Sequence, residues 1–234
     1  MGVSRTLHFG QSYASAASSV QERLRSVFNA GGDSGAWVRV VRKHLPVETV
    51  DEGAAVVRET HDTNAMLNTT RSLLTLSVNS ASASTLNAFA LATHAASGAC
   101  VFVATESNAE LDAIVAKLKA VWALRQTLRV DGSQYAMPNA GVTVRIGSVT
   151  VGTSSKGVLI EVEADTDDEA EGVTLIKATL KKLFRNVDKF SAWDVEKNVP
   201  ATYDYGGVEW LRNEEFGVSH SSFAIMKLCT KLIK

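Results

Sequence analysis

The chain has 234 residues, of which 45% are hydrophobic and 21% are charged, and its formal net charge is −1. That apolar content is enough to bury a core in one large domain or two small ones, and it excludes a disordered chain. The near-zero net charge excludes a general basic surface for nucleic acid or an anionic membrane, although it leaves room for local patches.

The first third of the chain alternates between apolar and polar residues, which predicts several strands around one helix. Ser19 is followed three residues later by Glu22, as in a capping box. We therefore expect a helix to begin there and to end at Gly31, where two glycines follow one another. Strands are expected over residues 3–9, 36–45, 54–60 and 71–78.

The middle of the chain predicts further strands and a second helix. Residues 80–84 alternate Ser and Ala and read as a turn, with strands over 86–93 and 99–104 behind it. Ser107 and Glu110 form a second capping box, which opens a helix and is followed by a strand near 126–136. The apolar face of this helix continues at helical spacing through Leu111, Ile114, Val115, Leu118, Val121 and Trp122.

Residues 147–165 predict a β-hairpin. Apolar residues fall on even positions up to Ile146 and on odd positions from Val149, so we expect a β-bulge or short turn near Gly147 and Ser148. Beyond the turn the alternation resumes and predicts one wet face. Val158, Ile160, Val162 and Ala164 should point inward, and Leu159, Glu161 and Glu163 outward.

The last part of the chain predicts helices. Thr166 and Glu169 form a third capping box before an amphipathic helix. Residues 194–208 read as a linker, a helical turn is expected around Trp210, and the chain ends in an amphipathic segment. The predicted fold class is α+β, a mainly antiparallel β-barrel of about eight strands flanked by three to four helices. We expect a single domain over 1–234, with a linker and helical tail over 190–234.

Tests for chemistry predict no catalytic, cofactor or metal site. In GTSSKG, Lys156 precedes the second glycine, whereas a phosphate-binding loop needs Lys after it, so a hairpin turn explains this stretch better. The acidic run over 161–171 lacks the order of a calcium loop. The five histidines are scattered, and Cys100 and Cys229 each lie in an apolar run, which favours a reducing compartment. No apolar run is long enough to span a bilayer, so we expect a soluble, intracellular protein.

Four blocks of the sequence, over 87–91, 99–104, 114–122 and 147–164, resemble a known family, as does the opening MGVS. That family is Mediator of RNA polymerase II transcription subunit 20, the TRF-proximal protein group. The most specific block is G-x-V-x-x-G-x-S-x-K-G followed by a strand ending in EVE. Its positions here are Gly147, Val149, Gly152, Ser154, Lys156, Gly157, Glu161 and Glu163. The chain departs from the family at Ala164, where an aromatic residue is common.

The resemblance implies a non-enzymatic subunit of the Mediator head module, in the nucleus and without a cofactor. Family members adopt a β-barrel flanked by helices and pair with the related barrel of Mediator subunit 18. That subunit in turn holds the C-terminal helix of subunit 8. The assembly links gene-specific activators to RNA polymerase II and the TATA-binding protein.

A subunit of this kind would bind its partner through a few apolar anchors. The candidates, chosen as apolar residues that look exposed, are Leu159, Trp210, Phe216, Phe223, Ile225 and Met226. One alternative is a barrel that binds a small ligand, or an enzyme whose site is assembled from distant residues. Another is a DNA-contacting module, for which the best basic cluster, Arg39, Arg42 and Lys43, is too small.

Overall fold

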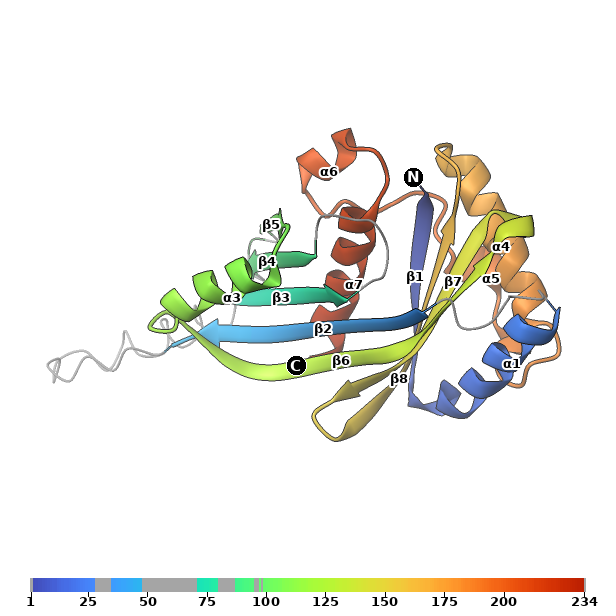
Figure 1. Ribbon diagram of the computed structural model, residues 1–234, viewed down its shortest axis with the longest axis horizontal. Coiled ribbons are helices and arrows are strands. Elements are labelled where there is room, and N and C mark those ends of the chain that lie inside the picture. The colour runs from blue at the N-terminus through green and yellow to red at the C-terminus, as the bar shows by residue number, and fades with distance from the viewer. Residues whose placement is uncertain are drawn as a thin grey trace, which may run out of the picture.

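The computed structural model describes residues 2–27, 35–47, 71–79, 87–94, 97 and 99–233. Eight antiparallel strands form one sheet that curls into a half-barrel, in the order β1-β8-β7-β6-β2-β3-β4-β5 (Figure 1). Within the described residues the two edge strands, β1 and β5, do not pair with each other, so the barrel is open. The strands are β1 (Val3–Phe9), β2 (Gly35–Pro46), β3 (Arg71–Asn79), β4 (Ala88–His94), β5 (Cys100–Thr105), β6 (Trp122–Met137), β7 (Val142–Val151) and β8 (Ser154–Ala164).

Helices flank this sheet, which confirms the predicted α+β class. Figure 1 shows α1, α4 and α5 together at one end of the molecule and α3 near the other, with α7 against the sheet between them. Two of the helices are single turns of four or five residues. The α-helices of the described part are α1 (Ala17–Val27), α3 (Asn108–Lys117), α4 (Glu169–Phe184), α5 (Val195–Asn198), α6 (Glu209–Asn213) and α7 (Val218–Leu232).

Two hydrophobic clusters lie on opposite faces of the sheet. The first packs α1 and α4 against β1, β7 and β8 and contains Ile146 and Ile160. The second packs α7 against β2, β3, β6 and their neighbours and contains Val149 and Leu159. Because successive residues of a strand point to opposite faces, Ile160 and Leu159 belong to different clusters although they are adjacent.

This arrangement explains the change of parity along β7. The buried face changes between Ile146 and Val149, and the strand stays continuous there, so the bulge predicted near Gly147 is wrong. The register shift between β7 and β8 instead lies at Val149 and Thr150. Gly147 pairs with Gly132 on β6. A Cβ added at Gly132 would lie 2.0 Å from the carbonyl oxygen of Ile146. The glycine pair lets two strands approach closely where the covered face changes.

Local signals placed the elements well, but some ends differ from the prediction. Ser107 caps α3 as expected, accepting from the backbone N–H groups of Ala109 and Glu110. The helix then ends at Lys117, and Trp122 begins β6. Ser19 lies inside α1, which continues a 3-10 helix over Gln11–Ala16, so its predicted capping box is wrong.

The cap predicted for the next long helix is also displaced. Asp168, not Thr166, caps α4 by accepting from the backbone N–H groups of Ala170 and Glu171. Thr166 supports this turn by accepting from the backbone N–H of Asp168. The strand predicted at 54–60, the turn at 80–84 and the helix end at Gly31 lie outside the described residues.

The predicted hairpin forms, but its wet face does not. Gly152 turns the chain with a φ of 57°, the left-handed region that glycine adopts freely. Leu159 and Glu161, both expected to face solvent, are each 1% exposed. The physical reason is that α7, from the far end of the chain, covers this second face, which the pattern of a single strand does not reveal.

Candidate partner interface

Four of the six predicted interface residues lie in the chain's own core. Phe223, Ile225 and Met226 on α7 are 0% exposed, and Leu159 lies in the same cluster. The premise that these residues are exposed is therefore wrong. Their apolarity is explained by packing between α7 and the second face of the sheet.

The other two candidates, Trp210 and Phe216, are half-buried. Trp210 on α6 stacks on Phe102 with ring centroids 5.5 Å apart, and its Nε1 donates to the carbonyl oxygen of Phe102 at 3.1 Å. Phe216 stacks on His220 at 4.3 Å. The structure thus places them in different aromatic groups, Trp210 at the edge strand β5 and Phe216 at the start of α7.

A buried ionic cluster lies between the sheet and α7. Arg145 on β7 donates to Glu161 at 2.9 Å and to Glu163 at 2.5 Å, both on β8. Glu161 also accepts from Ser221 Oγ on α7 at 2.7 Å. Burial alone would lower the pKa of Arg145, but the two carboxylates outweigh it and raise that pKa. Arg145 thus pairs with both carboxylates, and the hydrogen bond from Ser221 to Glu161 attaches α7 to this part of the sheet.

A groove along α4 is also neutralised by its own residues. It has a volume of about 700 Å³ and is bordered by α4, α5 and residues 201–202. Its two lysines, Lys177 and Lys181, both pair with Glu196, at 2.9 and 2.5 Å. Hydrogen bonds from these lysines lower the pKa of Glu196, so the carboxylate stays charged and paired.

The most unusual surface of the described part surrounds α3. Six large hydrophobic side chains there are exposed, from 39% for Leu118 to 64% for Val101. All come from the continuous segment 101–124, which contains β5, α3 and the start of β6. We call this surface the α3 patch; its residues are Val101, Val103, Ile114, Leu118, Val121 and Leu124.

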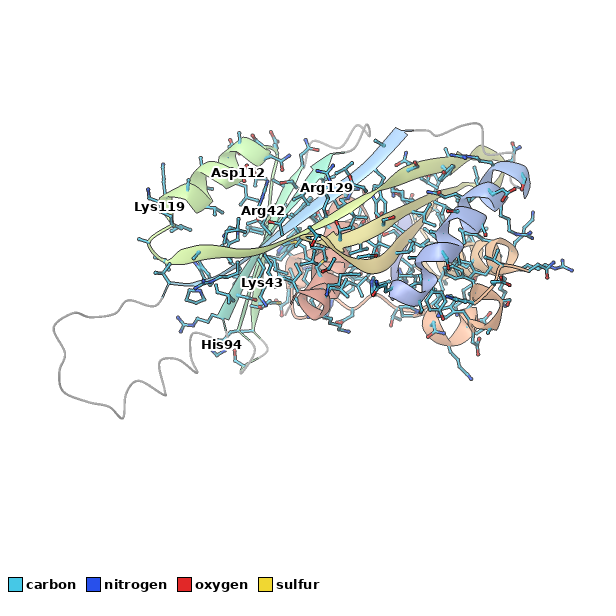
Figure 2. The ribbon with its side chains drawn as sticks, turned by 90° about the horizontal axis from the view of Figure 1, so that it is seen from below. Arg42, Lys43, His94, Asp112, Lys119 and Arg129 are labelled. Carbon is cyan, nitrogen blue, oxygen red and sulfur yellow. The ribbon has the colours of Figure 1, made fainter. Side chains whose placement is uncertain are left out.

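The seating of α3 explains why part of its apolar face is left open. Leu111 packs against Ala88 and Ala90 on β4, and Val115 packs beside it. Towards β2, Asp112 on the flank of the helix approaches Arg42 at 3.5 Å. Figure 2 shows both residues on the same side of the sheet.

Ile114 lies on the opposite side of α3 from Asp112, because two residues rotate a helix by more than half a turn. That side faces β5, the edge strand, where Val101 and Val103 project from the same face of the strand. Both side chains are largely exposed, at 64% and 48%, so no element of the described part covers them.

Basic residues border the α3 patch at the C-terminal end of the helix. Lys117 and Lys119 are exposed and form no ion pair with the described residues. Figure 2 shows Lys119 at the end of α3 that leads into β6. The nearest acids on the helix already have partners, since Asp112 meets Arg42 and Glu110 accepts from Thr105.

The sequence patterns did not predict the α3 patch as an exposed surface. Helical spacing identified Ile114 and Leu118 as part of an apolar face, but spacing alone does not say whether another element covers that face. Exposed apolar patches with a polar border are typical of surfaces that contact another molecule. Among the described residues no group of three or more His, Cys, Asp and Glu side chains could hold a metal ion. None of the helices described here is long and apolar enough to cross a bilayer.

The half-barrel, its two large clusters and the α3 patch define an α+β domain with an exposed apolar surface at one end. A family model described as TATA-binding related factor (TRF) of subunit 20 of Mediator complex matches residues 9–229. Because the match spans almost the whole sequence, the chain belongs to the family of Mediator subunit 20, a component of the transcription machinery. No curated protein matches the sequence.

Solved structures with a similar chain path have little sequence in common with this protein. PH1819 protein from Pyrococcus horikoshii OT3 is 13% identical, with a TM-score of 0.43, over 81% of this chain and 92% of that one. A chain of the Schizosaccharomyces pombe Mediator head module is 11% identical, with a TM-score of 0.34, over 80% of this chain and 96% of that one.

Proposed function

We propose that the chain is a non-enzymatic structural subunit of the Mediator head module, acting in the nucleus. It pairs directly with Mediator subunit 18 and lies in the same submodule as subunit 8. Through this assembly it helps to link gene-specific activators to RNA polymerase II and the TATA-binding protein in transcription initiation. Its mechanism is binding, and it needs no cofactor.

The observation that carries this proposal is the family match over residues 9–229. Two features of the structure agree with a binding role. The α3 patch exposes apolar side chains at one end of the sheet, and Trp210 and Phe216 remain half-exposed on the C-terminal segment. We keep these two aromatic residues as proposed partner contacts. We also propose that residues 1–234 act as a single domain, because both clusters use side chains of β6, β7 and β8.

The ligand-binding or enzymatic alternative has less support. It needs an open interior lined by polar or ionisable groups. Here the first face of the sheet is filled by α1 and α4 and the second by α7, while the charges of Arg145 and Glu161 are paired with each other.

Co-expression with Mediator subunit 18 tests the proposal. We expect a complex that stays together through size exclusion at low micromolar concentration, with an affinity in the range of about 10⁻⁶ M or tighter. Each subunit expressed without the other serves as the control for nonspecific retention. Separate elution of the two folded subunits would overturn the proposal.

A further inference from the structure

We propose that the α3 patch is the docking site for an amphipathic helix of a partner protein, one whose apolar stripe is bordered by Asp or Glu residues. The inference rests on the proposed function, because it names the chemistry of one partner of a binding subunit. Helix docking on an apolar surface uses anchors spaced three and four residues apart.

The geometry of the patch suits such a stripe. Ile114 and Leu118 are four residues apart on α3, so they stand one above the other on one side of the helix. Val101 and Val103 project from the same face of β5, beside that side of α3. A partner's apolar stripe therefore meets two rows of aliphatic side chains, one on a helix and one on a strand.

The charges select an acidic partner. Lys117 and Lys119 are exposed without an ion-pair partner in the described part of the chain. The helix dipole favours Lys117 at its position, but Lys119 lies beyond the helix and has no such explanation. Glu106, exposed at the other end of α3, repels acids there. The partner's acidic residues should thus lie near the end that meets Lys119.

Addition of a strand to the edge of β5 fits the structure less well than docking of a helix. The carbonyl oxygen of Phe102, which points away from β4, already accepts from Trp210 Nε1. Beside it, the thiol of Cys100 donates to the carbonyl oxygen of Gly206. The C-terminal segment therefore covers the backbone edge that an incoming strand would need.

The test uses the full chain and two labelled helical peptides of about 20 residues, long enough to form helices on their own. Both carry leucines spaced three and four residues apart; one has glutamates and the other lysines at the bordering positions. Fluorescence anisotropy at low salt should show the acidic peptide binding at least about tenfold more tightly. Equal binding of the two peptides would overturn the inference.

Variants place the interaction on the patch. Replacing Ile114→Ser together with Leu118→Ser should weaken the acidic peptide at least about tenfold. The pair Lys117→Glu and Lys119→Glu should abolish or reverse the preference for glutamate. The control pair Arg185→Glu and Lys231→Glu changes the same number of exposed charges elsewhere on the chain. It should leave the preference for the glutamate peptide unchanged. Wild-type affinity in the serine variant, with circular dichroism confirming its fold, would contradict the inference.

The outcomes separate this inference from the proposed function. If subunit 18 co-purifies while the two peptides bind equally, the proposed function stands and the docking inference falls. If the acidic peptide binds through Ile114 and Leu118 while subunit 18 does not co-purify, the docking site stands and the assignment to a pair with subunit 18 falls.

Discussion

Arg145 on β7 and Glu161 on β8 form an ion pair of 2.9 Å beneath α7. The Glu161 side chain is 1% exposed and also accepts from Ser221 on α7. One buried carboxylate therefore joins two strands of the sheet to the helix that covers them, and Arg145 is its charged partner.

Replacing Arg145→Ala should destabilise the fold by about 3 to 5 kcal/mol, because Glu161 would be left as a buried charge without its partner. The free energy of unfolding in urea measures this effect. Arg129→Ala is the matched control, since Arg129 forms an exposed pair with Asp131 and its loss should change the free energy of unfolding far less. Similar losses in the two variants would contradict the importance of the buried pair.

His220 should make the fold less stable as the pH falls. Its Nδ1 accepts from the backbone N–H of Gly217 and its Nε2 donates to the carbonyl oxygen of Leu211, an arrangement that requires the neutral ring. Burial lowers the pKa of His220 and outweighs the hydrogen bond to Leu211 and the charges of Glu214 and Glu169. The folded state therefore resists protonation more than the unfolded state does.

The sign of the pH effect follows from linkage. Below the unfolded histidine pKa of about 6.5 the unfolded chain binds more protons, so the free energy of unfolding should fall from neutral pH towards the lowered pKa of His220. Urea unfolding at several pH values measures the slope. In the His220→Gln variant, which keeps His8 and His44, the free energy of unfolding should change less with pH. An identical dependence on pH in the two proteins would show that His220 does not contribute.

Gly157→Ala should be far more damaging than Gly152→Ala. At Gly157 the φ is 119° and an added Cβ would lie 1.9 Å from the carbonyl oxygen of Phe9 on β1. Backbone strain and overpacking together predict a loss of about 2 to 6 kcal/mol. At Gly152 the φ is 57° and the space is open, so about 1 to 2 kcal/mol is expected. Thermal or urea unfolding distinguishes the two, and equal losses would contradict the close approach of β1.

Truncation of two residues of α3 should affect stability to very different extents. Leu111 is buried against β4, so Leu111→Ala should cost about 2 to 5 kcal/mol. Ile114 is 52% exposed, and Ile114→Ala should change the free energy of unfolding by about 0.5 kcal/mol or less. A large loss at Ile114 would mean that this side of the helix is covered within the chain.

What the sequence predicted correctly was mostly local. Ser107 caps its helix through backbone N–H groups two and three residues away, and Gly152 turns a hairpin between adjacent strands. Such features depend on a few consecutive residues, so their chemistry can be recognised without the fold. The most specific block of the family resemblance lies in the same hairpin, so it did not depend on the elements that were predicted wrongly.

What the sequence did not predict depends on residues far apart along the chain. Leu159 is buried because α7 packs on it from about sixty residues away, as the Ser221–Glu161 hydrogen bond also shows. Ile114 has the same apolar character, yet the described elements leave it open. The alternation around Leu159 and the helical spacing around Ile114 do not say whether another element covers the residue. Only the tertiary arrangement separates core from surface.

The hydrophobic packing at the two ends of the molecule does not share side chains. The cluster under α4 includes Leu180 and Phe184, whereas α3 rests on a separate group around Leu111. Substitutions around α3 can therefore accumulate without repacking the opposite end of the molecule. A half-barrel built this way can change the surface around α3 while the packing under α4 keeps its shape.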